Sequence, residues 1–187
     1  MCQIKSRLIH LNTEEGLNAS LFYNKDKDIY ALAYAGTELS SLMDIKADIL
    51  QNFGFESKQY NQALSIAASV SSRVGSSGLV FTGHSLGGGL ASAASLKTGR
   101  LGYTFNAAGL HLNTMGGRID SVRANRLITA YYAATDPLSY AQDNRWVSYA
   151  LSAATKLPIS FVPATGRRVV VDKASGHSIQ SMYDALR

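Results

Sequence analysis

With 187 residues, 46% of them hydrophobic, the chain is long enough for one domain with a sizeable core and too apolar for a disordered protein. We expect residues 1–187 to form a single domain. The net charge of +5 favours an anionic partner, but the basic residues are scattered, so a phospholipid surface or an acidic protein is favoured over nucleic acid. The single cysteine, Cys2, excludes an internal disulfide and a cysteine-based metal site.

The first eleven residues lack the apolar run of a signal peptide and carry Lys5, Arg7 and His10. No stretch of the chain has the apolar length that a bilayer-spanning helix needs. We therefore expect synthesis in the cytosol. A protein of this kind that acts elsewhere would travel by a specialised route, or the sequence would be one domain of a longer chain.

The first half of the chain is predicted to begin with a β-hairpin. Two β-rich runs, residues 17–23 and 29–34, are joined by a polar turn. Residues 39–50 place apolar side chains at helical spacing. A helix rich in Ala, Ile and Leu is predicted over residues 59–74, and Gly75 ends it.

The second half of the chain alternates apolar strands with helices. Strands are predicted at 101–105, 126–134 and 169–171, and helices within 138–157 and over 178–187. Residues 111–125 are predicted to be a loop with a short helical turn near 121–125. Because the central strands are apolar almost throughout, we expect an α/β fold: a mostly parallel sheet flanked by helices, with an antiparallel front hairpin.

The clearest motif is Gly-His-Ser-Leu-Gly at residues 83–87, between an apolar strand and a helix of small residues. This G-x-S-x-G pattern is typical of a nucleophile elbow, in which a sharp strand-to-helix turn lifts the serine hydroxyl above the sheet. A plain glycine-rich turn and a phosphate cradle are the alternatives. A phosphate-binding P-loop would end in Gly-Lys-Ser/Thr, which is absent here. The motif therefore predicts Ser85 as a nucleophile.

A serine nucleophile needs a histidine base and a carboxylate that orients it. The expected chain order is serine, acid, histidine, and only His111 and His177 follow Ser85. His111 has no acid between itself and the serine, so His177 is the predicted base. His84, next to the nucleophile, is expected to point away from the site and to be a packing residue.

Asp136 is the predicted acid, because it directly follows the strand at 126–134, where sites in open α/β sheets lie. An Asp-Pro pair after a strand is alternatively a simple turn initiator. Asp172 is the second candidate and Asp143 the third. For the oxyanion hole, we expect the backbone amide of Leu86 and a second amide from the loop that contains Thr37, whose hydroxyl could add a donor.

These residues resemble the class 3 lipases of the α/β-hydrolase superfamily over roughly residues 17–187. Ala35-Gly36-Thr37 is similar to the family's R-G-T/S oxyanion segment, and Asp44–Asp48 to its D-W-x-x-D stretch. Gly54-Phe55 resembles its G-F pair, Tyr103–Asn106 its strand before an F-G-x-P turn, and the elbow matches in full. The resemblance implies an α/β-hydrolase fold and places Asp136 and His177 where the family has its acid and base.

The sequence departs from the family in places, with Ala35 for the arginine, Ile45 for the tryptophan and Asn-Ala-Ala-Gly after Phe105. The segment between Asp48 and Gly54 is also very short, so a full fungal-type lid is not expected. These departures resemble compact bacterial members, some of which are phospholipase toxin domains delivered into rival cells. That resemblance implies an inhibitory immunity protein as partner. Because this chain is basic, we expect such a partner to be acidic.

The function expected from these features is serine-dependent hydrolysis of lipid esters through an acyl-enzyme, without metal or organic cofactor. The positive charge favours an anionic phospholipid, and therefore a phospholipase A contacting the membrane surface, over a triacylglycerol lipase. Apolar residues between acid and base are expected to line an acyl site or to pack in the core: Trp146, Tyr149, Leu157, Phe161 and Val162. The alternatives are an acyltransferase of the same fold and a non-catalytic module that binds a lipid or a partner.

Overall fold

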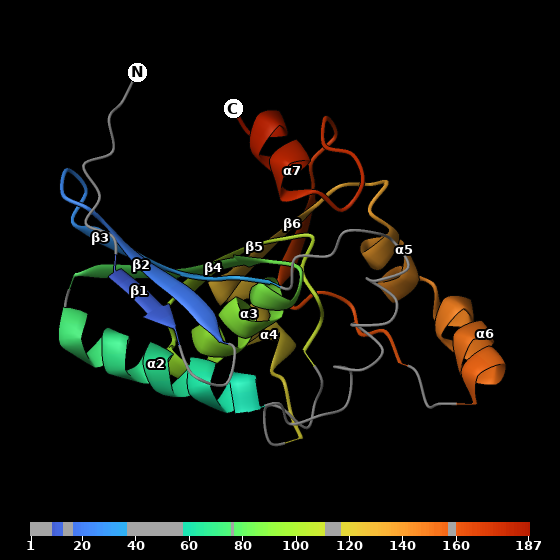
Figure 1. The fold of residues 1–187 in the computed structure, drawn as a ribbon, viewed down its shortest axis with the longest axis horizontal. Coiled ribbons are helices and arrows are strands. Elements are labelled where there is room, and N and C mark those ends of the chain that lie inside the picture. The colour runs from blue at the N-terminus through green and yellow to red at the C-terminus, as the bar shows by residue number, and fades with distance from the viewer. Residues whose placement is uncertain (1–8, 13–16, 37–57, 76, 111–116, 157–159) are drawn as a thin grey trace.

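A computed structural model describes residues 9–12, 17–36, 58–75, 77–110, 117–156 and 160–187 (Figure 1). The expected helical segment at 39–50 and the motif residues Asp44–Asp48 and Gly54-Phe55 lie outside these residues. In the described part of the chain, no helix has both the length and the apolar character needed to cross a membrane.

The described strands form one seven-stranded sheet whose order follows the sequence. The strands are β1 (Ile9–Asn12), β2 (Asn18–Asn24), β3 (Ile29–Tyr34), β4 (Gly78–His84), β5 (Leu101–Phe105), β6 (Ile128–Tyr132) and β7 (Arg167–Val170). β1 to β3 pair antiparallel, and β3 to β7 pair parallel. The predicted mostly parallel sheet with an antiparallel front hairpin is confirmed, and β1 is an addition to the predicted strands.

Helices cover the sheet on both sides, but unequally. The described helices are α2 (Lys58–Val74), α3 (Leu86–Thr98), α4 (Ser121–Leu127), α5 (Pro137–Asp143), α6 (Arg145–Thr155) and α7 (Ile179–Ala185). Figure 1 shows α2 and α3 together under one face and α7 on the other side. The helical stretch expected within 138–157 is two helices, because Asn144 ends α5 and its side chain caps the amide of Trp146 in α6.

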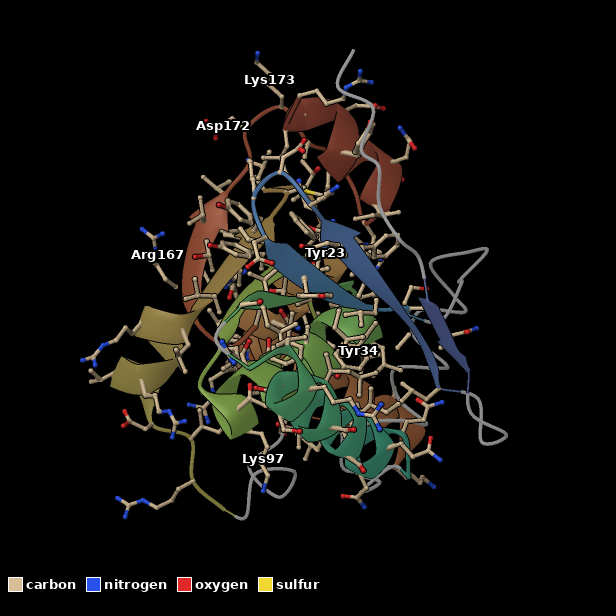
Figure 2. All side chains as sticks on the ribbon, turned by 90° about the vertical axis from the view of Figure 1, so that its left-hand side faces the viewer. Tyr23, Tyr34, Lys97, Arg167, Asp172 and Lys173 are labelled. Atoms are coloured by element: carbon tan, nitrogen blue, oxygen red, sulfur yellow. The ribbon has the colours of Figure 1, made fainter. Side chains whose placement is uncertain are left out.

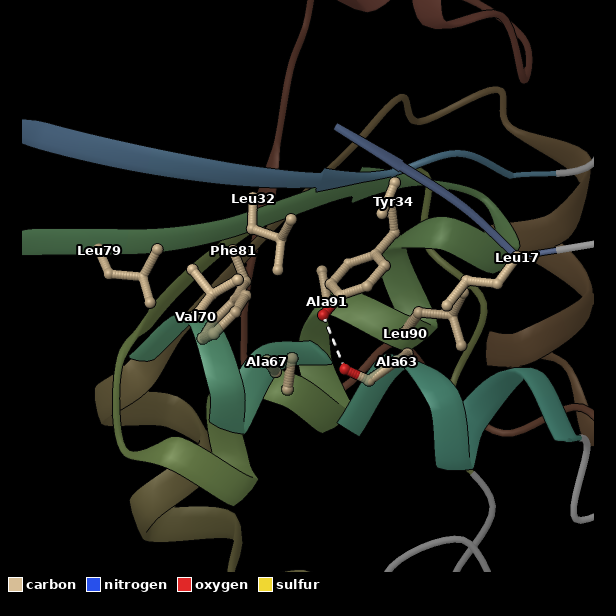
Figure 3. Close-up of a cluster of buried hydrophobic side chains, with 12 residues drawn as sticks. Leu17, Leu32, Tyr34, Ala63, Ala67, Val70, Leu79, Phe81, Leu90 and Ala91 are labelled. Carbon is tan, nitrogen blue, oxygen red and sulfur yellow. Dashed lines mark hydrogen bonds between the residues drawn. The ribbon is translucent and has the colours of Figure 1, made fainter. Parts of the chain in front are cut away.

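The main core lies between β3, β4 and the helices α2 and α3 (Figure 3). Leu32 and Phe81 are register partners on neighbouring strands, and both are completely buried. The Tyr34 hydroxyl donates to the Ala63 carbonyl of α2 at 3.0 Å, drawn as a dashed line in Figure 3. Burial raises the pKa of Tyr34, so it stays a neutral donor that ties α2 to the sheet. Leu90 and Ala91 of α3 belong to the same core, which holds the helix that begins at the site.

The opposite face of the sheet is covered mainly over its last strands. Met182 of α7 packs in a cluster with Phe105 and Tyr131. Earlier in β5, the strand that carries Phe105, Leu101 and Tyr103 remain exposed. The second helical layer therefore covers only part of its face, whereas the apolar character of the strands suggested fuller coverage.

Candidate active site

Ser85 lies at the turn between β4 and α3 in a backbone conformation that non-glycine residues rarely adopt, with φ 54° and ψ −124°. The flanking glycines permit it. A Cβ on Gly83 would lie 2.2 Å from the carbonyl oxygen of Gly87, and a Cβ on Gly87 would lie 2.3 Å from the carbonyl oxygen of Tyr34. Strand, turn and helix can come this close only without side chains there, as the elbow motif predicts.

The end of β5 and the turn after it form hydrogen bonds with both backbone polar groups of Ser85. The Ser85 amide donates to the Phe105 carbonyl at 3.2 Å, and the Ser85 carbonyl accepts from the Ala108 amide at 2.9 Å. The Gly88 amide of α3 donates to the same carbonyl at 3.0 Å. Because its backbone groups are bonded in three directions, Ser85 is held in the strained conformation rather than relaxing from it.

Asp136 follows β6 and caps the N-terminus of α5. Its carboxylate is completely buried and accepts four hydrogen bonds. These come from the amides of Leu138 at 3.2 Å and Ser139 at 3.0 Å, the Ser139 hydroxyl at 2.6 Å and His177 Nδ1 at 2.7 Å. The buried carboxylate is therefore held in a fixed orientation by donors alone, at the N-terminal end of α5.

The base candidate His177 therefore has a defined orientation. Its Nδ1 carries a proton, because the carboxylate of Asp136 can only accept, and this leaves Nε2 with the lone pair. The Nε2 atom is buried and has no hydrogen-bond partner among the described residues. A buried nitrogen without a hydrogen-bond partner destabilises an ordinary core. A general base, in contrast, needs a free lone pair that can accept the proton of the nucleophile.

Asn106 connects the loops that carry Asp136 and His177, a role that the sequence did not reveal. It is completely buried and has a left-handed φ of 42°. Its Oδ1 accepts from the Ala133 amide at 2.9 Å, and its Nδ2 donates to the Gly176 carbonyl at 3.3 Å. This residue stands at the start of the segment that departs from the class 3 lipase turn, and here it positions both Asp136 and His177.

The expectation that His84 points away from the site is wrong. Its Nε2 lies 2.6 Å from the backbone carbonyl oxygen of His177, and the two rings are 4.7 Å apart. A carbonyl only accepts, so His84 donates through Nε2. Burial, followed by the proximity of His177, lowers the pKa of His84 to about 4, so the ring is neutral at pH 7. The expectation failed because the elbow alone does not fix where the His84 ring points. The loop that carries His177 lies beside the ring, and this loop is distant in the sequence.

The other acid candidates lie elsewhere. Asp143 pairs with Arg168. Asp172 is exposed after β7, and Figure 2 shows it beside Lys173 at the outer edge of the molecule. Figure 2 also shows Lys97 and Arg167 in separate places, in keeping with the scattered basic charge. His111 lies outside the described residues.

The oxyanion-hole candidates are only partly described. Leu86 is the first residue of α3, so its amide has no acceptor within the helix. Gly36 approaches the nucleophile, since a Cβ placed on it would lie 3.5 Å from the Ser85 Cβ. Thr37 follows directly but lies outside the described residues.

The aromatic residues predicted to line an acyl site behave differently from one another. Phe161 packs against the buried Ala108 and Leu138. Trp146 and Tyr149 are instead 76% and 68% exposed, which places them neither in an enclosed acyl site nor in the core. Leu157 lies outside the described residues. Within the described ranges, no three His, Cys, Asp or Glu side chains gather as a metal site would require.

The chain is similar to lipases in fold and to a phospholipase in sequence. Over 107 residues it is 44% identical to an extracellular phospholipase A1 of Serratia liquefaciens; the match covers 56% of this chain and 32% of that protein. The chain thus spans about a third of that relative's length.

Two solved lipases share the fold at low identity. A triacylglycerol lipase from Penicillium expansum has a TM-score of 0.52 at 13% identity, covering 91% of this chain and 73% of its own. A triacylglycerol lipase whose catalytic centre is a serine protease triad has a TM-score of 0.52 at 14% identity, covering 90% and 68%. The family model for the Tle-like phospholipase domain matches residues 3–178. The chain therefore belongs to the Tle-like phospholipase family and has the α/β-hydrolase fold of lipases.

Proposed function

We propose that the protein hydrolyses acyl ester bonds of phospholipids, with Ser85 as nucleophile, His177 as general base and Asp136 as the carboxylate that orients it. The observation that carries this proposal is the orientation of His177. Its Nδ1 is bonded to a buried carboxylate at 2.7 Å, while its Nε2 is buried without a partner among the described residues. The serine of a strained elbow follows His84, whose ring lies against His177.

The reaction has two halves. His177 Nε2 accepts the Ser85 hydroxyl proton as Oγ attacks the ester carbonyl, and the C=O electron pair moves to oxygen to form a tetrahedral oxyanion. The oxyanion collapses, the C–O bond to the lysophospholipid breaks, and His177 returns its proton to the leaving alkoxide oxygen. Water then attacks the acyl-enzyme, with His177 again taking a proton, and the fatty acid leaves as Ser85 recovers its hydrogen.

The surrounding groups stabilise the charges that develop in these steps. Asp136 stabilises the imidazolium that forms on His177, and the neutral His84 adds no opposing positive charge beside it. The amide of Leu86, at the positive end of α3, would donate to the oxyanion together with an amide of the Gly36–Thr37 segment.

The substrate class comes from the family and from the phospholipase A1 relative. The net charge of +5 adds a preference for anionic phospholipid. Delivery into rival bacteria, and an inhibitory partner that would accompany it, stay predictions from the class 3 lipase resemblance.

The test is fatty-acid release from vesicles of phosphatidylglycerol and phosphatidylethanolamine by the wild type and by Ser85→Ala. A short-chain nitrophenyl ester, soluble as a monomer, is measured in parallel. Both activities should disappear in the variant while its thermal melt is unchanged. Release of fatty acid by Ser85→Ala at the wild-type rate would overturn the assignment of the nucleophile, and cleavage of the small ester alone would overturn the lipid substrate.

A further inference from the structure

The helix α6 presents apolar and aromatic side chains to the outside of the molecule. Its outward positions are Trp146, Tyr149, Ala150 and Ala153, which are exposed and lie at i, i+3, i+4 and i+7. Its half-buried inner side mixes apolar and polar residues: Val147, Ser148, Leu151 and Ser152. There the Ser148 hydroxyl accepts from the Phe161 amide at 3.0 Å. Surface helices normally present polar side chains outward, so an exposed side of Trp, Tyr and Ala is unusual for a helix that faces water.

The outer side is built as a compact aromatic surface. The Trp146 and Tyr149 rings meet edge to face with centroids 5.8 Å apart. Tyr140 of α5 is 63% exposed, and its hydroxyl accepts from the side chain of Asn144, which caps α6. We call Tyr140, Trp146 and Tyr149 the aromatic surface. Exposed rings that hold one another in place lose little conformational entropy when they bind.

Positive charge flanks this surface. The ten residues from Trp146 to Thr155 contain no charged side chain, and exposed Arg145 and Lys156 stand at the two ends. Asp143, the single acid of residues 137–171, pairs with Arg168, so no acid lies close in sequence to offset the charges of Arg145 and Lys156. Apolar and aromatic side chains between basic ends are the features of a helix that lies in the headgroup region of an anionic bilayer.

The position of α6 links this surface to the site. The α5 helix starts at the cap residue Asp136, and Asn144 alone separates it from α6. Figure 1 shows α5 and α6 beyond the end of the sheet toward which β4 runs, with α6 at the edge of the molecule. Among the described helices and strands, α5 is the main neighbour of α6.

From these observations we infer that the aromatic surface docks onto anionic phospholipid membranes and brings the site to its substrate. The choice of a membrane over a second copy of the chain rests on the flanking positive charge, which two identical surfaces would set against each other. It also rests on the proposed function, which supplies the phospholipid.

Trp146 is the only tryptophan of the chain, so its fluorescence reports on this surface alone. Ser85→Ala protein is titrated with vesicles of phosphatidylglycerol and phosphatidylethanolamine, and with pure phosphatidylcholine vesicles. We expect a blue shift with the anionic vesicles and a much weaker one with phosphatidylcholine. In a sedimentation assay, the affinity of Trp146→Ala for anionic vesicles should be lower by about tenfold or more. Burying a large apolar side chain raises an affinity by at least about tenfold.

Tyr183→Ala is the matched control, because Tyr183 is an exposed aromatic residue on α7 and outside the aromatic surface. It should bind vesicles as the parent does. In protein with Ser85 intact, the ratio of vesicle hydrolysis to nitrophenyl-ester hydrolysis should fall about tenfold in Trp146→Ala and stay unchanged in Tyr183→Ala.

An unshifted Trp146 emission in protein that sediments with vesicles would overturn the inference, because the membrane would then contact another surface. A blue shift that appears without vesicles and grows with protein concentration would also overturn it, in favour of a second copy. Failure of the proposed function is distinguishable. In that case wild-type protein cleaves neither substrate, yet the vesicle-induced shift of Trp146 and the weaker sedimentation of Trp146→Ala with anionic vesicles remain.

Discussion

His84 offers a prediction whose magnitude follows from the structure. The folded protein holds this histidine neutral, with its pKa lowered to about 4 by burial and by His177, whereas the unfolded chain has the ordinary value of 6.5. Between these values the unfolded state binds more protons, so stability falls as the pH falls from 6.5 to 4. The difference of about 2.5 pKa units corresponds to about 3 kcal/mol of folding free energy. The folded protein has this stability in full above pH 6.5 and has lost all of it below pH 4.

The variant His84→Gln keeps an amide donor near the position of Nε2 for the His177 carbonyl and removes the titration. Urea denaturation at steps from pH 7.5 to 4 would give the free energy of unfolding of both proteins. The wild type should lose about 3 kcal/mol more than the variant over this range, while at pH 7.5 the two differ by about 1 kcal/mol or less. Parallel curves would refute the reasoning, since His84 would then titrate alike in the folded and unfolded states.

Three further substitutions test the support of the site. Asp136→Asn should lower kcat about 10⁴-fold, because the amide no longer fixes the His177 tautomer; a loss below tenfold in ester assays would contradict this role. Asn106→Ala should lower the free energy of unfolding by about 2 kcal/mol, because the Ala133 amide loses its acceptor and alanine disfavours the left-handed conformation. Urea denaturation checks this, and a loss below 0.5 kcal/mol, on the order of an ordinary surface change, would contradict it. Gly87→Ala should yield little folded protein, because its Cβ would meet the Tyr34 carbonyl oxygen at 2.3 Å; a wild-type melting curve would contradict the tight elbow.

The strands of the parallel sheet and the elbow could be predicted because apolar runs and a glycine-flanked serine are recognisable in short stretches of sequence. A Cβ on Gly83 would meet Gly87 within the elbow, and a Cβ on Gly87 would meet Tyr34 of the neighbouring strand, yet both glycines are visible in one short motif. The apolar runs around them have the length of strands. The partner of His177 could be predicted in the same way, because Asp136 follows a strand directly and parallel strands bring such residues to one edge of the sheet.

The roles of His84 and Asn106 could not be predicted, because they depend on distant segments. His84 contacts a residue 93 positions away, and Asn106 reaches Gly176 across 70 positions. Neither pairing leaves a local signal in the sequence. The prediction that Trp146 and Tyr149 line an acyl site or pack in the core was wrong for a related reason. Periodicity identifies an aromatic stripe on a helix but not whether the stripe faces the core or the solvent.

The central claim is that Ser85, His177 and Asp136 act as one nucleophilic unit, and fluorophosphonate labelling tests it most directly. The reagent reacts covalently with an activated serine and does not depend on membrane docking or on the choice of lipid. Peptide mapping of the wild type should find the label on Ser85 alone, and His177→Ala should slow labelling by about a hundredfold or more. A label on another serine, or an undiminished rate in His177→Ala, would contradict the claim.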